Sequence, residues 1–325
     1  MTCIHLFAIL SIILSYLTVI CLSDAPNFVS SRGITVRSVS KLNNELYELT
    51  LSTTAVRGDQ KVRILLPRDY MSSGKTRRYP VLYLFHGSLG NAADWTASGK
   101  AQTILGHSSV ITVMPDGGKF GWYTNWVNPG HVAPQNWRTF HMEQLVPWID
   151  QNLRTTNEKK GRALIGLSMG GFGAMRYAEL YSDRFAFAAS LSGALDLLDL
   201  RIQAGILGSV TIDGKPLDGP FGAALLPWTK EGWIAQNPIT HAASLKGVTL
   251  AIYTGNQGIL EGTIRDTNYR MRDTLKSLNI PVYFNDYGNG ASIGQGCKGG
   301  HDFPCWSAAL TNVLPRMMAV LSQKY

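Results

Sequence analysis

The segment from Arg162 to Leu180, RALIGLSMGGFGAMRYAEL, constrains the fold more than any other part of the chain. An apolar run typical of a buried strand leads through Ser168 into a glycine-rich run with helical composition. Gly166 and Gly170 lie two positions before and two positions after the serine. This G-x-S-x-G pattern between a strand and a helix is typical of a nucleophile elbow, a strained turn that raises a serine hydroxyl above a sheet. The segment therefore predicts a strand, a tight turn with a nucleophilic serine, and a helix.

Apolar runs elsewhere in the chain fit a sheet built around that unit. LYELTLSTTA and QKVRILLP alternate between apolar and polar residues, as half-buried antiparallel strands do. YPVLYLFHG and SVITVMPDGG are continuously apolar, as are strands buried on both faces. Further strands are expected at 184–193, 248–256 and 280–288, and helices at 137–153, 170–181, near 263–278 and after Pro304. This alternation predicts an α/β protein with one mostly parallel sheet and helices on both faces.

The first 23 residues are expected to be a signal peptide. Residues 6–20 are apolar and uncharged, and the small side chain of Ser23 suits cleavage. A retained membrane anchor is the alternative. No other apolar run approaches the roughly 20 residues that span a bilayer, so no stable membrane span is expected once the signal is removed. These features predict a secreted protein.

The remainder of the chain is interpreted as one domain. Residues 24–32 read as a polar linker, and residues 33–325 as a single catalytic domain. Within it, residues 194–233 are rich in Gly and Pro and interrupt the alternation of strands and helices. This segment predicts a lid-like insertion over the sheet.

Export changes how the four cysteines are interpreted. Cys3 and Cys21 fall in the signal segment, which leaves Cys297 and Cys305 as an even pair in an oxidising compartment. We predict a disulfide between them, with two free thiols as the alternative. The small loop that this bond closes contains His301.

Charge and motif spacing restrict the classes of partner. The formal net charge of +8 is spread along the chain without a block of Lys and Arg, which favours anionic surfaces but does not argue for nucleic acid. No spacing of His, Cys and Asp suggests a metal site, and no Gly-rich loop suggests phosphate binding. We therefore expect no cofactor and no nucleic-acid partner.

A nucleophilic serine needs a base and an orienting acid. Behind an elbow of this kind the chain order is Ser168, then the acid, then the histidine. His301 lies in a Gly-rich loop after the last predicted strand, where the base is expected. The acid should follow the strand at 248–256, and the spacing leaves three candidates: Glu261, Asp266 and Asp273.

Two backbone N–H groups are expected to form an oxyanion hole. One belongs to Met169, directly after the nucleophile, and the other to Ser88, after the strand YLFHG. His86 precedes a glycine turn and is expected to shape this hole or contact the substrate. Trp122 and Trp126 lie in an aromatic loop and are candidates for contacts with an acyl or sugar group, with packing as the alternative.

Seven segments between Val62 and Met318 carry a resemblance to a known family: YLFHGSLGNAADW, VITVMPDGGKFGWYTNW, WRTFHMEQLVPWI, LIGLSMGGFGAM, WIAQNPI, YTGN and GGHDFPCW. Through them the chain resembles the esterase-D-type α/β-hydrolases, and within these the secreted mycolyltransferases of the antigen 85 group and related actinobacterial esterases. The resemblance implies the α/β-hydrolase fold, a triad of Ser168, an acid and His301, and the oxyanion hole described above. Counting along the helix after YTGN, it places the acid at Asp273, with Glu261 as the alternative.

The sequence as a whole predicts a secreted serine hydrolase that cleaves carboxylic esters through an acyl-enzyme, with a small-molecule, lipid or sugar ester as substrate. One alternative is an acyltransferase of the mycolyltransferase or diacylglycerol acyltransferase type, which passes the acyl group to a sugar or glycerol hydroxyl. The other is a secreted binding protein that keeps the same scaffold without turnover.

Overall fold

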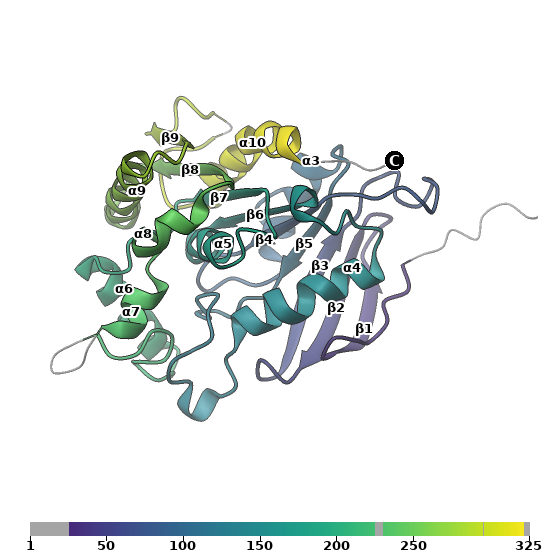
Figure 1. Cartoon of the computed structure of the whole chain (residues 1–325), viewed down its shortest axis with the longest axis horizontal. Helices are drawn as coiled ribbons and strands as arrows, with labels where there is room; N and C mark the ends of the chain where they lie inside the picture. The colour runs from purple at the N-terminus through teal and green to yellow at the C-terminus, as the bar shows by residue number, and fades with distance from the viewer. Residues whose placement is uncertain (1–25, 225–229, 295, 322–325) are drawn as a thin grey trace, which may run out of the picture.

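Nine strands of the described chain form one sheet, in the order β1-β2-β3-β5-β4-β6-β7-β8-β9 (Figure 1). The computed structural model describes residues 26–224, 230–294 and 296–321, so the predicted signal peptide lies outside the described residues. The strands are β1 (Ile34–Lys41), β2 (Leu46–Thr53), β3 (Asp59–Leu65), β4 (Val81–Phe85), β5 (Ile111–Pro115), β6 (Arg162–Leu167), β7 (Phe187–Leu191), β8 (Thr249–Gly255) and β9 (Val282–Gly288). The six strands from β5 to β9 pair in parallel, whereas β1, β2 and β3 add an antiparallel end, which confirms the predicted mostly parallel sheet.

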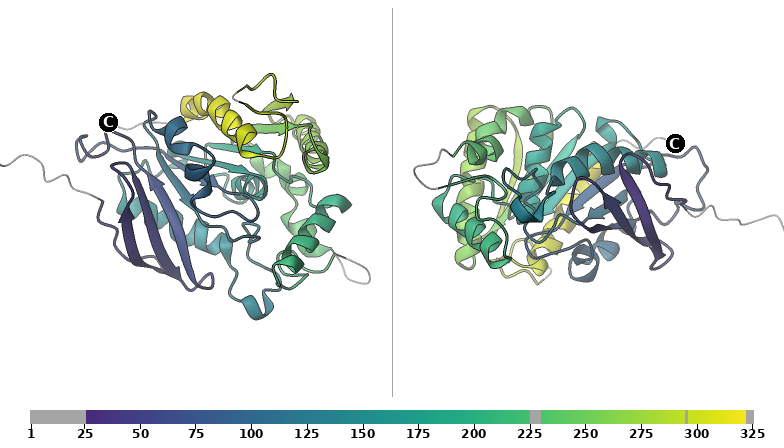
Figure 2. Two further views of the ribbon diagram at one scale, coloured as in Figure 1. Left: turned by 180° about the vertical axis from the view of Figure 1, so that it is seen from behind. Right: turned by 90° about the horizontal axis from the view of Figure 1, so that it is seen from below.

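Side chains alternate across the central strands and so create a core on each face of the sheet. In β4, Val81, Tyr83 and Phe85 join one apolar cluster, whereas Leu82 and Leu84 join the other. The first cluster is covered by α4 (Val146–Asn152), α5 (Met169–Leu180) and α9 (Ile259–Ser277). The second is covered by α2 (Asp94–Ala97), α3 (Ala101–Leu105) and α10 (Phe303–Val320), as the view from behind shows (Figure 2). Helices therefore cover both faces, as predicted.

The helix predicted at 137–153 is divided into two parts. A π-helical segment, η2 (Thr139–Leu145), leads into α4, and the Val146 N–H donates to the carbonyl of His141, five residues earlier. Pro147 has no N–H group and its ring excludes the usual bond of an α-helix interior, so the wider turn precedes it. This arrangement turns the buried His141 toward the middle of the sheet, where the site described below is formed.

In the described part of the segment predicted as an insertion, between β7 and β8, helix α6 (Leu200–Ile212) lies within its bounds and α7 (Glu231–Gln236) begins near its end. The Asp199 carboxylate caps α6 by accepting a hydrogen bond from the Arg201 N–H. Shorter helical pieces complete the described chain: η1 (Gly130–Val132), η3 (Lys159–Gly161), α8 (Pro238–His241) and η4 (Ala242–Leu245). Of the helices in the described ranges, none is both long and apolar enough to cross a membrane.

Candidate active site

Ser168 lies in a strained turn between β6 and α5. Its backbone has φ +51° and ψ −121°, a conformation that residues with a side chain seldom adopt. The flanking glycines are required by close approach: a Cβ at Gly166 would lie 2.1 Å from the Gly170 carbonyl oxygen, and a Cβ at Gly170 would lie 2.5 Å from that of His86. The turn has the geometry of the predicted elbow, with the serine at the end of a central strand.

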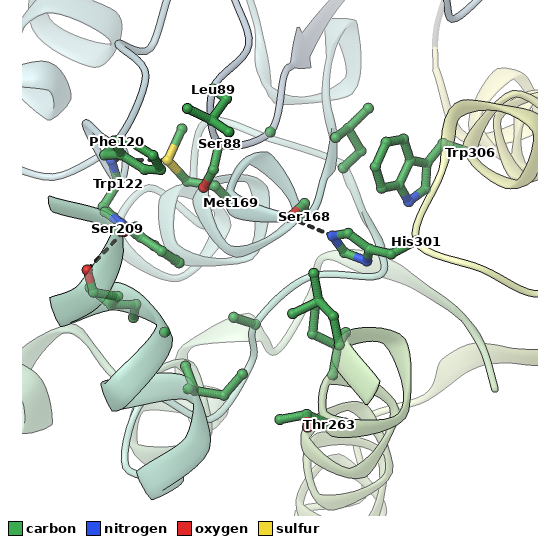
Figure 3. Close-up of a pocket in the computed structure, with 18 of the residues that line it drawn as sticks. Ser88, Leu89, Phe120, Trp122, Ser168, Met169, Ser209, Thr263, His301 and Trp306 are labelled. Carbon is green, nitrogen blue, oxygen red and sulfur yellow. Dashed lines mark hydrogen bonds between the residues drawn. The ribbon is translucent and has the colours of Figure 1, made fainter. Parts of the chain in front are cut away.

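His301 joins the serine from the far end of the chain. Its Nε2 lies 2.8 Å from Ser168 Oγ, within hydrogen-bond distance (Figure 3). The residue precedes α10, whose first turn is capped by the Asp302 carboxylate accepting from the Cys305 N–H. Cys297 and Cys305 form a disulfide across this loop, which confirms the predicted pairing.

Glu261, in the first turn of α9, holds the other side of the imidazole. Its Oε2 lies 2.7 Å from His301 Nδ1, and its side chain has no exposed surface. Its Oε1 accepts hydrogen bonds from the Ser192 hydroxyl at 2.8 Å, the Thr254 hydroxyl at 3.1 Å and the Gly255 N–H at 2.7 Å. Both carboxylate oxygens are thus fixed by donors from β8 and from two loops, which sets the orientation of the histidine. Nothing in the sequence pattern singled out Ser192 or Thr254.

The prediction that Asp273 supplies the acid is wrong. Asp273 lies twelve positions beyond Glu261 in α9, about 18 Å further along the helix axis at 1.5 Å per residue. Its side chain is 60% exposed and forms an ion pair with its neighbour Arg272. Asp266 is also turned away and pairs with Arg201 of α6. Glu261, retained as an alternative, is the carboxylate that contacts His301.

Ser88 and Met169 border the same cavity as Ser168, where the oxyanion hole was expected. Within the described part of the chain, the backbone N–H groups of these two residues donate no hydrogen bond. Met169 is the first residue of the 12-residue helix α5, whose initial N–H groups have no partner inside the helix and carry its positive dipole end. Both groups are thus available to a negatively charged oxygen next to Ser168.

Two buried histidines, His86 and His141, hold the loop after β5, next to the predicted oxyanion hole. Since His86 Nε2 accepts a hydrogen bond from the Gly117 N–H at 2.8 Å, its proton lies on Nδ1, 2.7 Å from the Gly87 carbonyl. The Asp116 carboxylate, 3.4 Å from the same Nε2, therefore receives no proton from it. His141 Nε2 lies 2.8 Å from the Asp116 carbonyl, so the peptide between Asp116 and Gly117 is held at both ends.

His141 belongs to the core and stays neutral at ordinary pH. Its Nδ1 lies 3.0 Å from the Tyr177 hydroxyl, and burial lowers the pKa of the imidazole to about 4. The expectation that His86 contacts substrate is wrong, because the side chain is buried and lies behind the cavity; the structure supports its other predicted role, shaping the loop. The sequence analysis did not identify His141. A single histidine in an apolar helix gives no sign that it will contact the Asp116 carbonyl.

A cavity of about 640 Å³ opens over Ser168 and is lined mainly by apolar side chains (Figure 3). Of the two tryptophans considered for substrate contact, Trp122 lines the cavity. Trp126 does not line it, and its indole N–H donates to the Gly121 carbonyl at 3.0 Å. Most of the wall comes from two loops and three helices: Leu89 after β4 and Phe120 after β5; Ile202, Gly205 and Ile206 of α6; Ile259, Leu260 and Ile264 of α9; Phe303 and Trp306 of α10.

The α6 wall was not identified from the sequence. The N-terminal end of α6 is joined to α9 by ion pairs. Arg201 Nη1 lies 3.0 Å from Asp266 Oδ2, and Arg270 Nη2 lies 2.8 Å from Asp199 Oδ2. These pairs keep one wall of the cavity next to the helix that carries Glu261.

Known proteins resemble the chain over most of its length. A family model named Esterase, with the description "Putative esterase", matches residues 53–317. Esterase Rv1288 of Mycobacterium tuberculosis is 39% identical over 268 residues, which are 77% of this chain and 57% of that protein. The chain thus spans little more than half of that relative.

Two further proteins are similar to the chain. The diacylglycerol acyltransferase/mycolyltransferase Ag85B of Mycobacterium leprae is 25% identical over 264 residues, 74% of this chain and 76% of that protein. The crystal structure of Mycobacterium tuberculosis MPT51 superposes with a TM-score of 0.69 over 88% of this chain and 99% of that chain, at 20% identity. At that identity the superposition establishes the shared α/β-hydrolase fold.

Proposed function

Since the chain belongs to the esterase family, we propose that it is a secreted serine hydrolase that cleaves carboxylic esters through Ser168, His301 and Glu261. One observation carries the proposal: a continuous hydrogen-bonded chain runs from the Ser168 hydroxyl through the His301 ring to the buried Glu261 carboxylate. The serine end of this chain faces an apolar cavity. A nucleophile, a base and an orienting acid in this order are what acyl transfer through a serine requires.

In the proposed reaction, Ser168 Oγ attacks the acyl carbon of the ester while its proton passes to His301 Nε2. The carbonyl oxygen becomes negatively charged and accepts hydrogen bonds from the Ser88 and Met169 N–H groups. Glu261 accepts from His301 Nδ1 and stabilises the imidazolium. The C–O bond then breaks, and the alcohol leaves with the proton from Nε2. A water molecule, deprotonated by His301, attacks the acyl-enzyme and releases the carboxylic acid and the free serine.

Two observations support export. The disulfide between Cys297 and Cys305 suits an oxidising compartment, and the apolar N-terminal segment has the composition of a signal peptide. The mainly apolar cavity supports an ester with an apolar acyl group as the substrate.

Acyl transfer to a sugar or glycerol hydroxyl is the second candidate, favoured by the similarity to the acyltransferase of Mycobacterium leprae. It requires the same acyl-enzyme, with an alcohol in place of water in the second half. Adding glycerol to the assay separates the two: hydrolysis yields free acid alone, whereas transfer yields glyceryl ester. The third candidate, a binding protein without turnover, is disfavoured by the intact hydrogen-bonded chain.

Labelling with a fluorophosphonate probe tests the serine directly. We expect the folded protein to form a stoichiometric adduct, located on Ser168 by peptide mass analysis, and to hydrolyse p-nitrophenyl esters until it is labelled. Protein that neither reacts with the probe nor turns over any ester would contradict the proposal and support the binding protein instead.

A further inference from the structure

The proposed chemistry assigns the two halves of an ester to different ends of the cavity. His301 Nε2 must return its proton to the leaving oxygen, so the alcohol portion has to lie on the His301 side of Ser168. The carbonyl oxygen is placed at Ser88 and Met169, and the acyl chain extends from the carbonyl carbon, away from His301. Figure 3 shows this order: Trp306 lies beyond His301, whereas Trp122 and Phe120 lie beyond the predicted hole.

One face of helix α6 forms the wall on the acyl side. Arg201, Ile202, Gly205, Ile206 and Ser209 line the cavity, and their spacing of three or four positions keeps them on a single face of the helix. Ser209 is seen below Trp122 in Figure 3, at the end opposite Trp306. The Ser209 end of this face therefore lies on the acyl side, and Gly205 is one turn before Ser209 on the same face.

Gly205 is the position on this face without a side chain. Among the described residues, no atom beyond the chain neighbours and the helix's own backbone lies within 4 Å of a Cβ built at Gly205, and its φ is not positive. Neither close packing nor backbone conformation therefore requires glycine there, although glycine is disfavoured inside helices. Gly208, one turn further along α6, has equally open surroundings but does not line the cavity.

We propose that Gly205 determines which acyl groups the protein accepts: the space left by its missing side chain admits an extended or bulky apolar acyl chain. This inference rests on the proposed ester hydrolysis and adds the class of substrate to it. A cavity of about 640 Å³ is within the range of sites that hold drug-sized ligands, far more than an acetyl group occupies. Esters with long acyl chains are thus the expected substrates.

The test compares Gly205→Leu with the matched control Gly208→Leu. Both changes add the same side chain to exposed positions of one helix, and leucine favours the helix over glycine. The readout is the ratio of kcat/KM for p-nitrophenyl octanoate to that for p-nitrophenyl acetate. We expect this ratio to fall at least about tenfold in Gly205→Leu, since misfit by single methylenes changes specificity by about tenfold or more. In Gly208→Leu it should stay within about twofold of wild type.

A second substrate series varies the alcohol at constant acetyl: p-nitrophenyl acetate against 2-naphthyl acetate. The proposal expects their ratio to stay within about twofold in Gly205→Leu, because the substitution lies on the acyl side. A changed alcohol ratio with an unchanged acyl ratio would reverse the assignment of the two ends. Equal losses for every ester, or no change for any, would also overturn the role of Gly205.

Two checks keep these outcomes distinct. Far-ultraviolet circular dichroism establishes that each variant is folded, and Gly205→Ala, with a smaller side chain, should shift the acyl ratio in the same direction by a smaller factor. Wild-type turnover is measured first. Absence of turnover with any ester removes the proposed function itself, whereas turnover with an unaltered ratio in both Gly205 variants removes only the inference about the acyl wall.

Discussion

The two turns that carry Ser168 and His301 are held in place by different means. The Ser168 turn follows β6, in which every residue is buried, and is held by backbone packing and by its N–H bond to the Leu191 carbonyl at 2.9 Å. The His301 loop follows β9, the last strand of the sheet, most of whose residues are partly exposed. It is held by Glu261, by the disulfide and by the Gln257 N–H, which donates to the Gly299 carbonyl at 2.9 Å.

Because the two turns are held differently, substitutions near each of them should affect different properties of the protein. Because the nucleophile turn is part of the core, changes in its surroundings should first alter the free energy of unfolding. Because the base depends on a few polar bonds and one covalent bond at the end of the sheet, changes there should lower turnover in a chain that is still folded. The following predictions test this contrast, from the largest expected effect to the smallest.

Ser168→Ala removes the nucleophile without altering the packing of the turn. We expect kcat for p-nitrophenyl esters to fall by about 10⁴–10⁶-fold, as in other serine triads, while the melting temperature stays close to wild type. The measurement is steady-state hydrolysis together with a thermal melt. A variant that retains a tenth of the activity would show that another residue is the nucleophile.

Glu261→Gln tests the acid, with Asp273→Asn as the matched control in the same helix. The glutamine amide fits the site but no longer offers a carboxylate to His301 Nδ1, so the imidazolium is left without its partner. We expect kcat to fall by about 10³–10⁴-fold in Glu261→Gln and to stay within about twofold in Asp273→Asn. The opposite ranking would restore Asp273 as the acid.

Replacing both Cys297 and Cys305 with Ala loosens the base loop. The disulfide joins residues eight positions apart, and the chain-entropy relation assigns a loop of this size about 2–3 kcal/mol of unfolding free energy. We expect a loss of that order in urea titrations and, below the transition, a lower kcat because His301 is less well positioned. Unchanged kcat in the folded variant would show that the other bonds suffice to hold the loop.

Gly170→Ala tests the nucleophile turn. The added Cβ would lie 2.5 Å from the His86 carbonyl oxygen and 2.7 Å from that of Phe85, so the backbone must shift. We expect a loss of about 1–3 kcal/mol in unfolding free energy. Gly208→Ala, which has open surroundings, is the control and should be neutral or slightly stabilising. Equal stability of the two variants would contradict the close packing of the turn.

His141 should give the smallest effect, a pH dependence of stability. Burial lowers its pKa from 6.5 to about 4, so between these values the unfolded chain binds more protons than the folded one. Its contribution is complete above pH 6.5 and is lost as the pH falls toward 4. From pH 7 to pH 6 this amounts to about 0.5–1 kcal/mol. His141→Gln should show a shallower decline of the melting temperature over that interval, and an identical slope would contradict the assignment.

Much of the fold and half of the site were predictable from the sequence. Short-range patterns identify the central strands, the elbow at Ser168 and the histidine after the last strand, because each depends on residues adjacent in the chain. Spacing after the strand did not separate Glu261, Asp266 and Asp273, since all three follow the same strand, and it is the direction of α9 relative to His301 that separates them. A signal was available: Glu261 lies in the first turn of the helix, directly after the strand end.

The remaining contacts depend on elements far apart in the sequence. His86 and His141 meet opposite ends of one peptide only because η2 packs behind the loop after β5. The cavity wall in α6 lies in a segment whose Gly and Pro content favoured a description by composition rather than by helical spacing. In both cases the relevant information is tertiary.

The position of helix α6 also has a consequence for how the substrate preference of such a protein can change by mutation. The helix borders the cavity with one face, and its N-terminal end is joined to α9 by ion pairs of Arg201 with Asp266 and of Arg270 with Asp199. Among the described residues, none of α6 forms a side-chain hydrogen bond with Ser168, His301 or Glu261, so substitutions on its cavity face leave those bonds in place. Acyl preference can therefore change while the catalytic residues keep their bonds. A mutant library restricted to residues 201–209 should yield variants with new acyl preferences more often than a library of equal size spread over the sheet.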